Sequence, residues 1–394
     1  MSGHDVVIVD GVRSAVGTFG GSLKDVPAAD LGALVIREAI RRSGVDPEAV
    51  DEVILGCVGQ VSSDAYIARV AAVKAGIPVR NTAQTVNRLC GSGLQALITA
   101  SQWLRLDDAQ VVVAGGAENM SRLPYYVWNR WGRRLGSSEL EDGVLSAVSD
   151  PFQHYAMGVT AERVAEKFGV SRQEQDALAL DSQGRARDAI AAGRFTNQIV
   201  PVDIPGAKGH AGPFQVDEHP RETTAEKLAA LKPAFAEGGT VTAGNASGIN
   251  DGAAAVVMTT SAYAAERGLQ PRARLMGYGL SGIEPEIMGY APVEAIRRAL
   301  NRAGLSLADM ALVELNEAFA AQAVAVVRDA GLDWNRTNVN GGAIALGHPI
   351  GATGAILTVK LLHELERRGQ RYGLVTMCIG GGQGIAAVFE NLRR

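Results

Sequence analysis

The sequence predicts an α/β protein made of two related halves with a long insertion between them. Short apolar runs alternate with segments of helical periodicity, which is typical of α/β folds. Part of the sequence also recurs at a constant offset of 260 residues, which indicates an internal duplication. The chain of 394 residues is longer than one ordinary hydrophobic core supports, so more than one domain is expected.

The alternating segments give the expected elements. Strands are expected at residues 6–9, 52–55, 109–113, 312–315 and 374–378, where the runs are short and apolar. Helices are expected at residues 29–43, 93–106, 292–303, 318–329 and 354–368, where apolar positions follow helical spacing.

The duplication is visible in two matched pairs of segments. IREAIRRSGVDPEAVDEVILG at residues 36–56 matches IRRALNRAGLSLADMALVELN at residues 296–316, each with a helix, a glycine, a loop and an apolar strand. CGSGLQAL at residues 90–97 matches GATGAILT at residues 351–358. Two matches in the same order indicate a duplicated βαβ-rich domain whose halves pack against each other.

The domain boundaries follow from this repeat. We interpret residues 1–120 together with 249–270 as the N-terminal half, and residues 271–394 as the C-terminal half. Residues 121–248 differ from both, and we interpret them as an inserted loop domain. An insertion beside a duplicated core is a natural place for substrate contacts and for oligomerisation.

Composition narrows the class of protein. Apolar residues make up 47% of the chain and charged ones 20%, with a net charge of −4; this favours a globular protein and gives no positive field for nucleic acid. No apolar run is long enough to span a membrane, and the N-terminus lacks the pattern of a signal peptide.

The three cysteines are too few for a disulfide framework, so we expect free thiols in a reducing cytoplasm. The common P-loop and zinc motifs are absent from the sequence, and no metal site is expected.

Cys90 is the first candidate for chemistry. It lies in NRLCGSG, directly before an expected apolar helix. Backbone N–H groups and the positive end of the helix dipole favour the thiolate there, and the thiolate is the form that attacks acyl carbonyls. The alternative is a small buried residue at a tight turn.

His348 lies in NGGAIALGHPIG, at residues 340–351. Ordering a loop so rich in glycine costs conformational entropy, which suggests a specific role. The loop precedes the helix that the repeat equates with the one after Cys90, so packed halves would bring both loops to one site. Imidazole can take or give a proton at neutral pH. The alternative is a structural turn histidine.

Three further residues complete the candidate set. Cys378 ends an apolar strand before three glycines and could be a second acid/base or a core cysteine. Cys57 follows a strand without such a loop, and we interpret it as structural. Asn316, beside Glu317 at a strand-to-helix junction, would suit a helix N-cap, but it could equally hold a water or a carbonyl oxygen in the site.

Six motifs together resemble the thiolase family, in the family's order and over essentially the whole chain. They are NRLCGSGLQA at 87–96, GAENMSR at 116–122, GTVTAGNASGIND at 239–251, NEAFAAQA at 316–323, NGGAIALGHPIGATGA at 340–355 and CIGGGQG at 378–384. The resemblance implies a duplicated five-layer αβαβα core with an inserted loop domain that binds coenzyme A.

The resemblance also implies catalytic roles. Cys90 is similar to the acyl-carrying nucleophile, His348 to the base that activates it, and Cys378 to the acid/base that acts on the acetyl-CoA methyl carbon. Asn316 resembles the residue that, with His348, forms one oxyanion hole through a bound water. The N–H groups of Cys90 and Gly380 match the other hole. This set supplies the acyl carrier, base and oxyanion donors that Claisen chemistry needs.

Coenzyme A and acyl-CoA are implied as substrates, with no tightly bound cofactor. Ser247 matches a residue that contacts the pantetheine arm, and Arg221 is a weaker match to one near the nucleotide. Met157 and Ala243 lie in the same implied binding region. As partners we expect no nucleic acid and no membrane. We expect a homodimer through the core sheets, doubled into a homotetramer through the region that begins at Ser121.

The chain departs from the family pattern at three places. Ala156 stands where the family usually has histidine, and Lys227 where many relatives have serine. Tyr290-Ala291 replaces a smaller Gly-Pro-like pair. We expect the departure at Ala156 to enlarge or reshape the acyl pocket, so the sequence predicts the reaction class better than it predicts the acyl preference.

The expected function is reversible condensation of acyl-CoA with acetyl-CoA, or thiolysis of 3-oxoacyl-CoA, with acetoacetyl-CoA as the first substrate to test. Longer, branched or dicarboxylic 3-oxoacyl chains form the alternative. A decarboxylating condensing enzyme of the ketoacyl-synthase type would not need Cys378. A non-catalytic acyl-CoA-binding relative would not need Cys90, His348 and Cys378 together.

Overall fold

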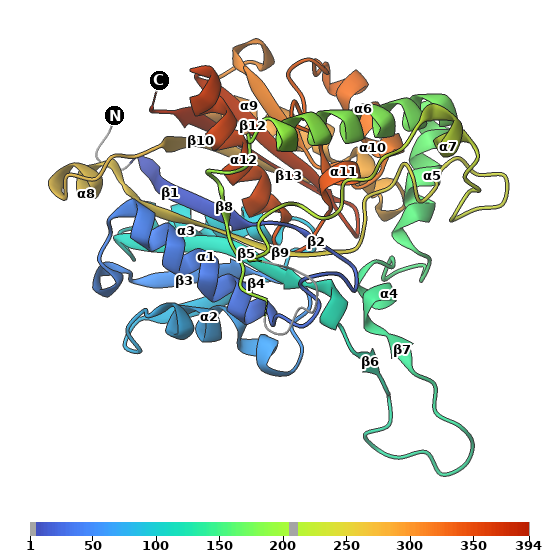
Figure 1. Ribbon diagram of the computed structural model, residues 1–394, viewed down its shortest axis with the longest axis horizontal. Helices are drawn as coiled ribbons and strands as arrows, with labels where there is room; N and C mark the ends of the chain where they lie inside the picture. The colour runs from blue at the N-terminus through green and yellow to red at the C-terminus, as the bar shows by residue number, and fades with distance from the viewer. Residues whose placement is uncertain (1–4, 205–211, 394) are drawn as a thin grey trace.

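The computed structural model describes residues 5–204 and 212–393, and in them one continuous hydrogen-bonded path of strands links two halves, called here the first and second sheets. The strand order runs β11-β12-β13-β10-β1-β9-β5-β3-β4. The two sheets join where β1 pairs with β10 over only two residue pairs, Val7 with Arg274 and Ile8 with Ala273. Figure 1 shows the later part of the chain, in orange and red, lying above the earlier part in blue.

The first sheet is built from the N-terminal third of the chain and one returning strand. Its members are β1 (Val6–Ser14), β3 (Glu52–Gly56), β4 (Thr82–Val86), β5 (Val111–Asn119) and β9 (Asn250–Thr260). The short β2 (Gly17–Thr18) pairs with β9. Helices α1 (Ala28–Ser43) and α2 (Ile67–Ala75) cover its outer face, and α3 (Ser92–Arg105) covers its inner face.

The second sheet repeats this plan. Its members are β10 (Ala273–Gly282), β11 (Leu312–Leu315), β12 (Tyr372–Ile379) and β13 (Gln383–Asn391). Helices α9 (Pro292–Ala303) and α10 (Ala320–Ala330) lie on its outer face, and α12 (Thr353–Arg368) lies on its inner face against α3. The described residues therefore form five layers, αβαβα, which confirms the predicted fold class.

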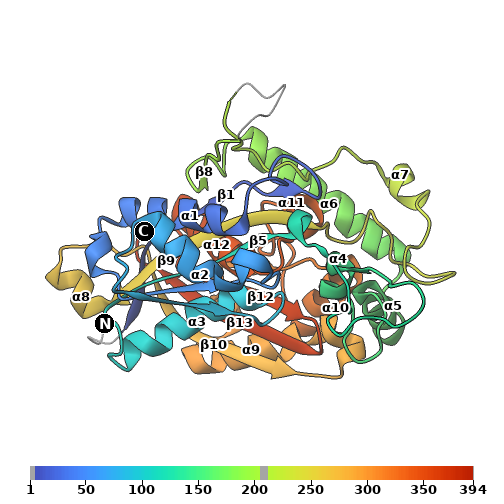
Figure 2. The same cartoon turned by 90° about the horizontal axis from the view of Figure 1, so that it is seen from below.

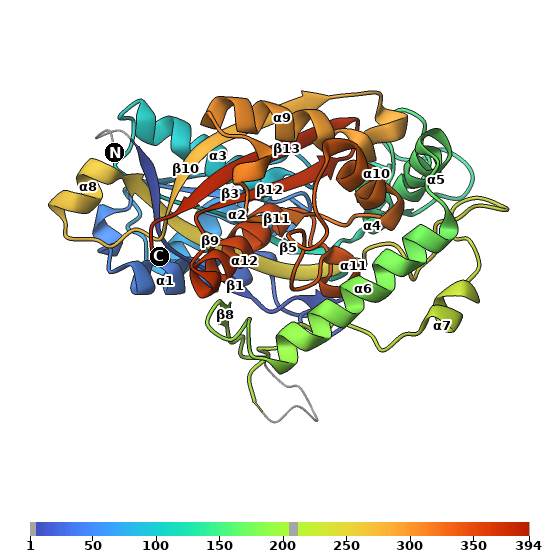
Figure 3. The same cartoon turned by 90° about the horizontal axis from the view of Figure 1, so that it is seen from above.

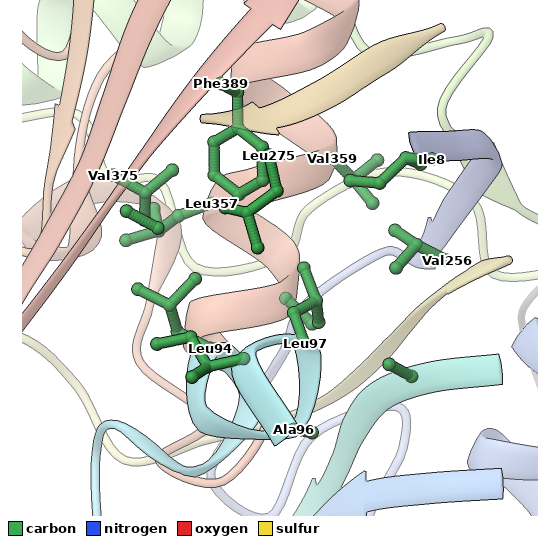
Figure 4. Packing of buried hydrophobic residues seen from close by; sticks show 14 of the residues in the cluster. Ile8, Leu94, Ala96, Leu97, Val256, Leu275, Leu357, Val359, Val375 and Phe389 are labelled. Carbon is green, nitrogen blue, oxygen red and sulfur yellow. The ribbon is translucent and has the colours of Figure 1, made fainter. Parts of the chain in front are cut away.

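Side-chain alternation along the strands produces the layers. In β5, Val111 and Val113 belong to the apolar cluster under α1 and α2, whereas Val112 and Ala114 belong to the cluster around α3 and α12. Because successive strand residues point to opposite faces, one apolar strand serves two cores. Figure 4 shows side chains of α3, α12 and both sheets gathered in the central core.

The internal repeat corresponds to matching local structure. Helix α1 ends at Gly44 (φ 72°), a 3₁₀ turn spans Pro47–Ala49, and β3 follows. Helix α9 ends at Gly304 (φ 66°), a 3₁₀ turn spans Leu307–Asp309, and β11 follows. Both glycines adopt the left-handed conformation that ends many helices.

The second matched pair of sequence segments forms the beginnings of α3 and α12, where these two helices cross. A Cβ on Gly354 would lie 2.3 Å from the backbone nitrogen of Leu94, and a Cβ on Gly93 would lie 2.9 Å from that of Ala355. The two helices therefore touch backbone to backbone, and only glycine allows this approach. Each helix begins just after one of the two candidate loops.

Several of the expected boundaries were wrong. The strand expected at 6–9 is β1, which continues to Ser14. The strand expected at 109–113 is β5, which continues to Asn119 through Gly115 and Gly116. Those glycines did not end the strand; a Cβ on Gly116 would lie 2.3 Å from the carbonyl oxygen of Gly351, so they allow close approach. The helix expected at 318–329 is α10, which begins only at Ala320.

The segment between β5 and β9, described at residues 121–204 and 212–248, consists of loops, helices and short strands. It contains β6 (Tyr125–Tyr126), β7 (Glu141–Asp142), α4 (Gly143–Ala147), α5 (Met157–Phe168), α6 (Arg172–Ala191), β8 (Ile199–Val200) and α7 (Ala225–Ala229). Helix α5 contacts α10, and α6 contacts both α10 and α11 (Ala343–Leu346). Figures 2 and 3 both show α6 along the outside of the body beside α11. The β6–β7 loop projects away from the rest of the chain (Figure 1).

Within the described ranges, no helix is both long and apolar enough to cross a membrane.

Candidate active site

A cavity of about 250 Å³ brings the main candidate residues together. It lies where the loops before α3 and α12 meet the end of β12 and the start of α5. Its lining is predominantly apolar, and the sulfur and imidazole groups of three residues are among its few reactive groups. These are Cys90, His348 and Cys378.

Cys90 lies at the turn that leads into α3. Leu89 before it has a positive φ of 42°, a strained conformation for a side chain of this kind. The Ser92 hydroxyl donates to the Leu89 carbonyl at 2.6 Å and accepts the N–H of Arg88 at 2.9 Å, which holds the turn. The thiol therefore faces the cavity from a fixed backbone.

Burial dominates the charge state of Cys90. It raises the pKa of the thiol to about 11, although the N–H groups of Gly380 and of Cys90 itself interact with the sulfur and lower the pKa. The position before a helix, by itself, favours the thiolate. In the folded chain desolvation is the larger effect, so the resting group is a thiol that needs a base.

His348 lies opposite as a buried, neutral imidazole. Burial lowers its pKa to about 4, so it carries no charge at neutral pH and can accept a proton. Its Nδ1 is 2.7 Å from the Thr353 hydroxyl, and its Nε2 is 3.4 Å from Nδ2 of Asn316. Its backbone N–H donates to Oδ1 of Asn250 at 2.9 Å, while Nδ2 of Asn250 donates to the Gly17 carbonyl at 3.0 Å.

Cys378 is the next-to-last residue of β12 and is buried near the thiol of Cys90. Burial raises its pKa well above the ordinary value, and the nearby Cys90 adds to the shift. Gly380 follows and also lines the cavity; a Cβ there would lie 2.5 Å from Cε of Met157. Gly381 and Gly382 have positive φ values of 80° and 83°, which turns the chain sharply after the strand.

Asn316 does not cap a helix. Its backbone N–H donates to the Thr376 carbonyl at 3.0 Å, and α10 begins four residues later with Phe319 at the N-cap position. Its side-chain Oδ1 is buried without a hydrogen-bond partner. A buried unsatisfied oxygen next to His348 leaves one polar position for a water or a substrate group.

Glu317, the neighbour of Asn316, organises the loop that carries His348. Its carboxylate accepts hydrogen bonds from the Ser182 hydroxyl at 2.7 Å and from Nδ2 of Asn338 at 2.7 Å. It also accepts the backbone N–H of Ile344 at 3.3 Å. This network links α6 to the turn after β11, to the loop before α11 and to α11 itself.

The four expected coenzyme A-binding residues fall into two groups. Ser247 and Met157 line the cavity. Arg221 and Ala243 do not; both are exposed, and Nη2 of Arg221 donates to the Ala243 carbonyl at 3.4 Å. Cys57 is buried outside the cavity, with its sulfur 3.6 Å from Oε1 of Glu118.

The three positions that depart from the family pattern also differ in where they lie. Ala156 lines the cavity, whereas Lys227 is exposed on α7. Tyr290 does not line it: its ring stacks on Phe168 with centroids 3.9 Å apart, and its hydroxyl donates to Asp329 at 3.0 Å.

Sequence reasoning missed several residues of the site. The apolar wall includes Met288, Phe319 and Phe235, and their residue types carry no functional signal. Asn250 supports the backbone of His348, and its position in the GIND motif was the one available hint. Glu118 was also missed; it accepts the backbone N–H groups of Val58, Gly59 and Gly351.

Among the parts of the chain that the structure describes, no three His, Cys, Asp or Glu side chains are grouped as metal ligands. The cavity brings together two thiols, a neutral imidazole and backbone N–H groups.

Comparison with known proteins agrees with the fold. The family described as "Thiolase, N-terminal domain" matches residues 6–262, and "Thiolase, C-terminal domain" matches residues 269–391. The chain is 55% identical over 393 residues to the beta-ketothiolase BktB of Cupriavidus necator, covering 99% of this chain and 100% of that protein.

Solved structures give the same result. The acetyl-CoA acetyltransferase of Bacillus anthracis superimposes with a TM-score of 0.96 at 49% identity, covering 99% of both chains. Human mitochondrial 3-ketoacyl-CoA thiolase in complex with CoA gives a TM-score of 0.95 at 46% identity, covering 98% of both chains.

The chain therefore belongs to the thiolase family. It is an acyltransferase enzyme with thiolase activity.

Proposed function

We propose that this thiolase acts on short-chain substrates, with acetoacetyl-CoA cleaved to acetyl-CoA or formed from it, through an acyl group on Cys90. The observation that carries the proposal is the single cavity lined by Cys90, His348 and Cys378. Two thiols and one neutral imidazole provide the nucleophile and the proton carriers that this chemistry needs.

The first half of the reaction forms the acyl-enzyme. In thiolysis, the Cys90 proton passes to Nε2 of His348 while the sulfur attacks the 3-oxo carbon of the substrate. The C2–C3 bond then breaks, and the enolate of acetyl-CoA takes a proton from the Cys378 thiol. Acetyl-Cys90 and acetyl-CoA are the products of this half.

The second half transfers the acyl group to coenzyme A. The thiol of free coenzyme A attacks acetyl-Cys90, its proton restores the Cys378 thiol, and the Cys90 sulfur recovers the proton held by His348. In the direction of synthesis the same groups act in reverse, and Cys378 removes a proton from the methyl carbon of acetyl-CoA.

Backbone and amide donors support the two oxyanions of these steps. The N–H groups of Gly380 and Cys90 point at the Cys90 sulfur, and we assign them to the oxyanion that develops on the acyl carbonyl at that sulfur. We assign His348 and Asn316, with a water on the unsatisfied Oδ1 side, to the oxygen of the enolate. Fixed donors of this kind commonly contribute about 3 kcal/mol each to the transition state.

Coenzyme A is proposed as an exchanged substrate, with no tightly bound cofactor. Ser247 and Met157 line the cavity and are proposed to contact the pantetheine arm. Arg221 and Ala243 contact each other on the surface; we propose that they lie near the nucleotide. Lys227, on the adjacent α7, adds a second cation for its phosphates.

The size and lining of the cavity support a short acyl group. Pockets for drug-sized ligands usually measure about 300–1,000 Å³, and this cavity measures about 250 Å³. Among the described residues that line it there is no Lys or Arg, so a second carboxylate on the acyl chain would be buried without a partner. Ala156 in place of histidine leaves that part of the wall small.

The direct test is loss of acetoacetyl-CoA absorbance with free coenzyme A. We expect turnover of acetoacetyl-CoA, slower turnover of 3-oxohexanoyl-CoA and little of 3-oxoadipyl-CoA. A preference for the six-carbon or dicarboxylic substrate would overturn the short-chain proposal. Absence of any acyl group on Cys90 by intact mass, with every acyl-CoA, would overturn the assigned mechanism.

We further propose that residues 121–248 form an inserted domain that both binds coenzyme A and assembles a homotetramer from two homodimers. The projecting β6–β7 loop (Figure 1) carries Trp128 and Trp131 with 87% and 94% of their surfaces exposed. Tyr125, Leu135 and Leu140 on the same segment are exposed as well. So many large apolar side chains on one projecting segment are typical of an interface.

Sedimentation of a Trp128→Ala, Trp131→Ala double variant tests the assembly. We expect a tetramer for the wild type and a dimer for the variant, with Leu106→Ala as the control because Leu106 is an exposed apolar residue at the end of α3. A variant that stays tetrameric would contradict the assignment.

We propose a cytoplasmic setting, since the chemistry requires Cys90 and Cys378 as reduced thiols.

A further inference from the structure

One contact of His348 has no part in the scheme above. Nδ1 of His348 lies 2.7 Å from the hydroxyl of Thr353, and both side chains are buried. The Thr353 hydroxyl is also 2.8 Å from the carbonyl oxygen of Pro349, which accepts the backbone N–H groups of Ala352 and Thr353 as α12 begins. The hydroxyl is thus fixed between the imidazole and the first turn of the helix.

The proton count indicates which tautomer this contact selects. A hydroxyl has one proton, and in this geometry Thr353 donates it to the Pro349 carbonyl. The hydroxyl oxygen then accepts a hydrogen bond from Nδ1–H of His348. On the other side of the ring, the Asn316 amide presents Nδ2, a donor, to Nε2 at 3.4 Å. Both contacts fit a neutral imidazole with its proton on Nδ1 and a lone pair on Nε2.

That tautomer is the one that the proposed chemistry requires. Nε2 must be unprotonated to take the proton of Cys90, and the imidazolium that forms must keep a partner for Nδ1–H. The other titratable groups near His348 are Cys90 and Cys378 across the cavity and Glu118, which binds the N–H of Gly351 in the same turn. In the described chain, Thr353 is the side chain hydrogen-bonded to Nδ1.

We propose that Thr353 is a positioning residue that fixes the Nδ1–H tautomer and the ring orientation of His348, so that Nε2 acts as the base for Cys90. The inference rests on the proposed function, because it assigns a partner to the base of the acyl-transfer step. A base held by a third group is a common arrangement for activated nucleophiles. Here the third group is neutral, so a moderate effect on rate is expected.

Helix α12 provides a matched control. The hydroxyl of Thr358 donates to the Gly354 carbonyl at 2.8 Å, four residues back, as that of Thr353 does to Pro349. Both threonines are buried, but no hydrogen bond joins Thr358 to His348 among the described contacts. Thr358→Val therefore removes a comparable hydroxyl from the same helix without touching the imidazole.

The experiment is the rate of acetyl-Cys90 formation from acetyl-CoA, followed by rapid quench and intact mass, with steady-state kcat and KM for acetoacetyl-CoA. For Thr353→Val we expect the acetylation rate and kcat to fall about tenfold, the size of one lost hydrogen bond in a transition state. KM should stay within about twofold. Thr353→Ser should recover most of the rate, and Thr358→Val should resemble the wild type.

The outcomes separate the two proposals. If wild type acetylates Cys90 and Thr353→Val acetylates it as fast as Thr358→Val does, the positioning role is wrong and the proposed mechanism stands. If Thr353→Ser is as slow as Thr353→Val, the effect is one of shape and the tautomer role is likewise wrong. If wild type itself does not acetylate, both proposals fall. Thr353→Ala repeats the comparison in case Thr353→Val does not fold.

Discussion

Oε2 of Glu118 accepts the backbone N–H of Gly351 at 2.9 Å. The same carboxylate accepts the N–H groups of Val58 and Gly59 at 2.8 and 2.9 Å. One buried side chain at the end of β5 therefore holds both the loop after β3 and the turn between His348 and α12. Strand β5 belongs to the first duplicated unit, and the turn before α12 belongs to the second duplicated unit. This carboxylate therefore fixes part of the contact between the two units.

We expect Glu118→Gln to reduce both stability and activity. The amide NH₂ would replace one acceptor oxygen and face backbone donors, which costs about 2 kcal/mol in the free energy of unfolding. The turn that carries His348 would also lose a support, and kcat should fall. Glu294→Gln is the control, since Glu294 is half-exposed and pairs with two surface arginines; such pairs contribute about 0–1 kcal/mol. Equal melting temperatures for the two variants would show that the buried network is unimportant.

The three cysteines offer a matched series. Cys90→Ala should lower thiolysis by roughly a thousandfold or more, because the covalent carrier is lost. Cys378→Ala should block thiolysis and slow, without abolishing, the acetylation of Cys90 by acetyl-CoA, because Cys378 exchanges a proton with coenzyme A in that step. Cys57→Ala should keep nearly wild-type activity, since Cys57 lies outside the cavity. Intact mass after exposure to acetyl-CoA distinguishes the variants, and an inactive but folded Cys57→Ala would contradict this division of roles.

The reactivity of Cys90 should rise steeply with pH. Burial raises the pKa of its thiol to about 11, so the thiolate fraction grows about tenfold per pH unit below that value. Alkylation by iodoacetamide, followed by mass spectrometry of the Cys90 peptide, should therefore increase throughout pH 7–10. A plateau below pH 8 would mean that the helix N-terminus, not burial, controls the thiol.

His219 should make the fold sensitive to acid. Burial, with the charge of Arg221 as a second cause, lowers its pKa to about 4, whereas an unfolded histidine titrates near pH 6.5. Above pH 6.5 both states are neutral and stability is complete. As the pH falls from 6.5 to 4, the unfolded chain binds a proton that the folded chain does not, and about 3 kcal/mol is lost.

Comparison with His219→Asn isolates that contribution from other titrating groups. Between pH 7 and pH 4.5, the free energy of unfolding of wild type should fall about 2 kcal/mol more than that of the variant, at one protomer concentration. His154→Asn is the control because His154 is exposed. Parallel curves for wild type and His219→Asn would rule out this role.

Part of the fold could be predicted from the sequence because its signals are local. The periodic segments at α1 and α9, with Gly44 and Gly304 after them, reveal both the helices and the duplication. Strand β9 (Asn250–Thr260) was missed: its centre is a run of alanines, and it becomes a strand because β1 and β5 pair with it on both sides. Strand propensity of that kind depends on tertiary partners.

The candidate site likewise contains residues that local sequence patterns predict and residues that they do not. Cys90 and His348 could be predicted to converge because each precedes a helix of the repeat. The contact from Glu118 to Gly351 spans 233 residues, and that from Asn250 to His348 spans 98. No local pattern encodes such pairs. The pKa of Cys90 was mispredicted for a related reason, since desolvation depends on neighbours from several distant segments.

The crossing of α3 and α12 at Gly93 and Gly354 has an evolutionary consequence. Each helix follows one of the two reactive loops. The contact between these rigid helices therefore sets the distance between the Cys90 thiol and the His348 imidazole. A single copy of the duplicated unit holds only half of the machinery and would have to meet a second copy from solution. Fusion of the copies makes that encounter intramolecular, and the effective concentration of one half around the other no longer depends on protein abundance.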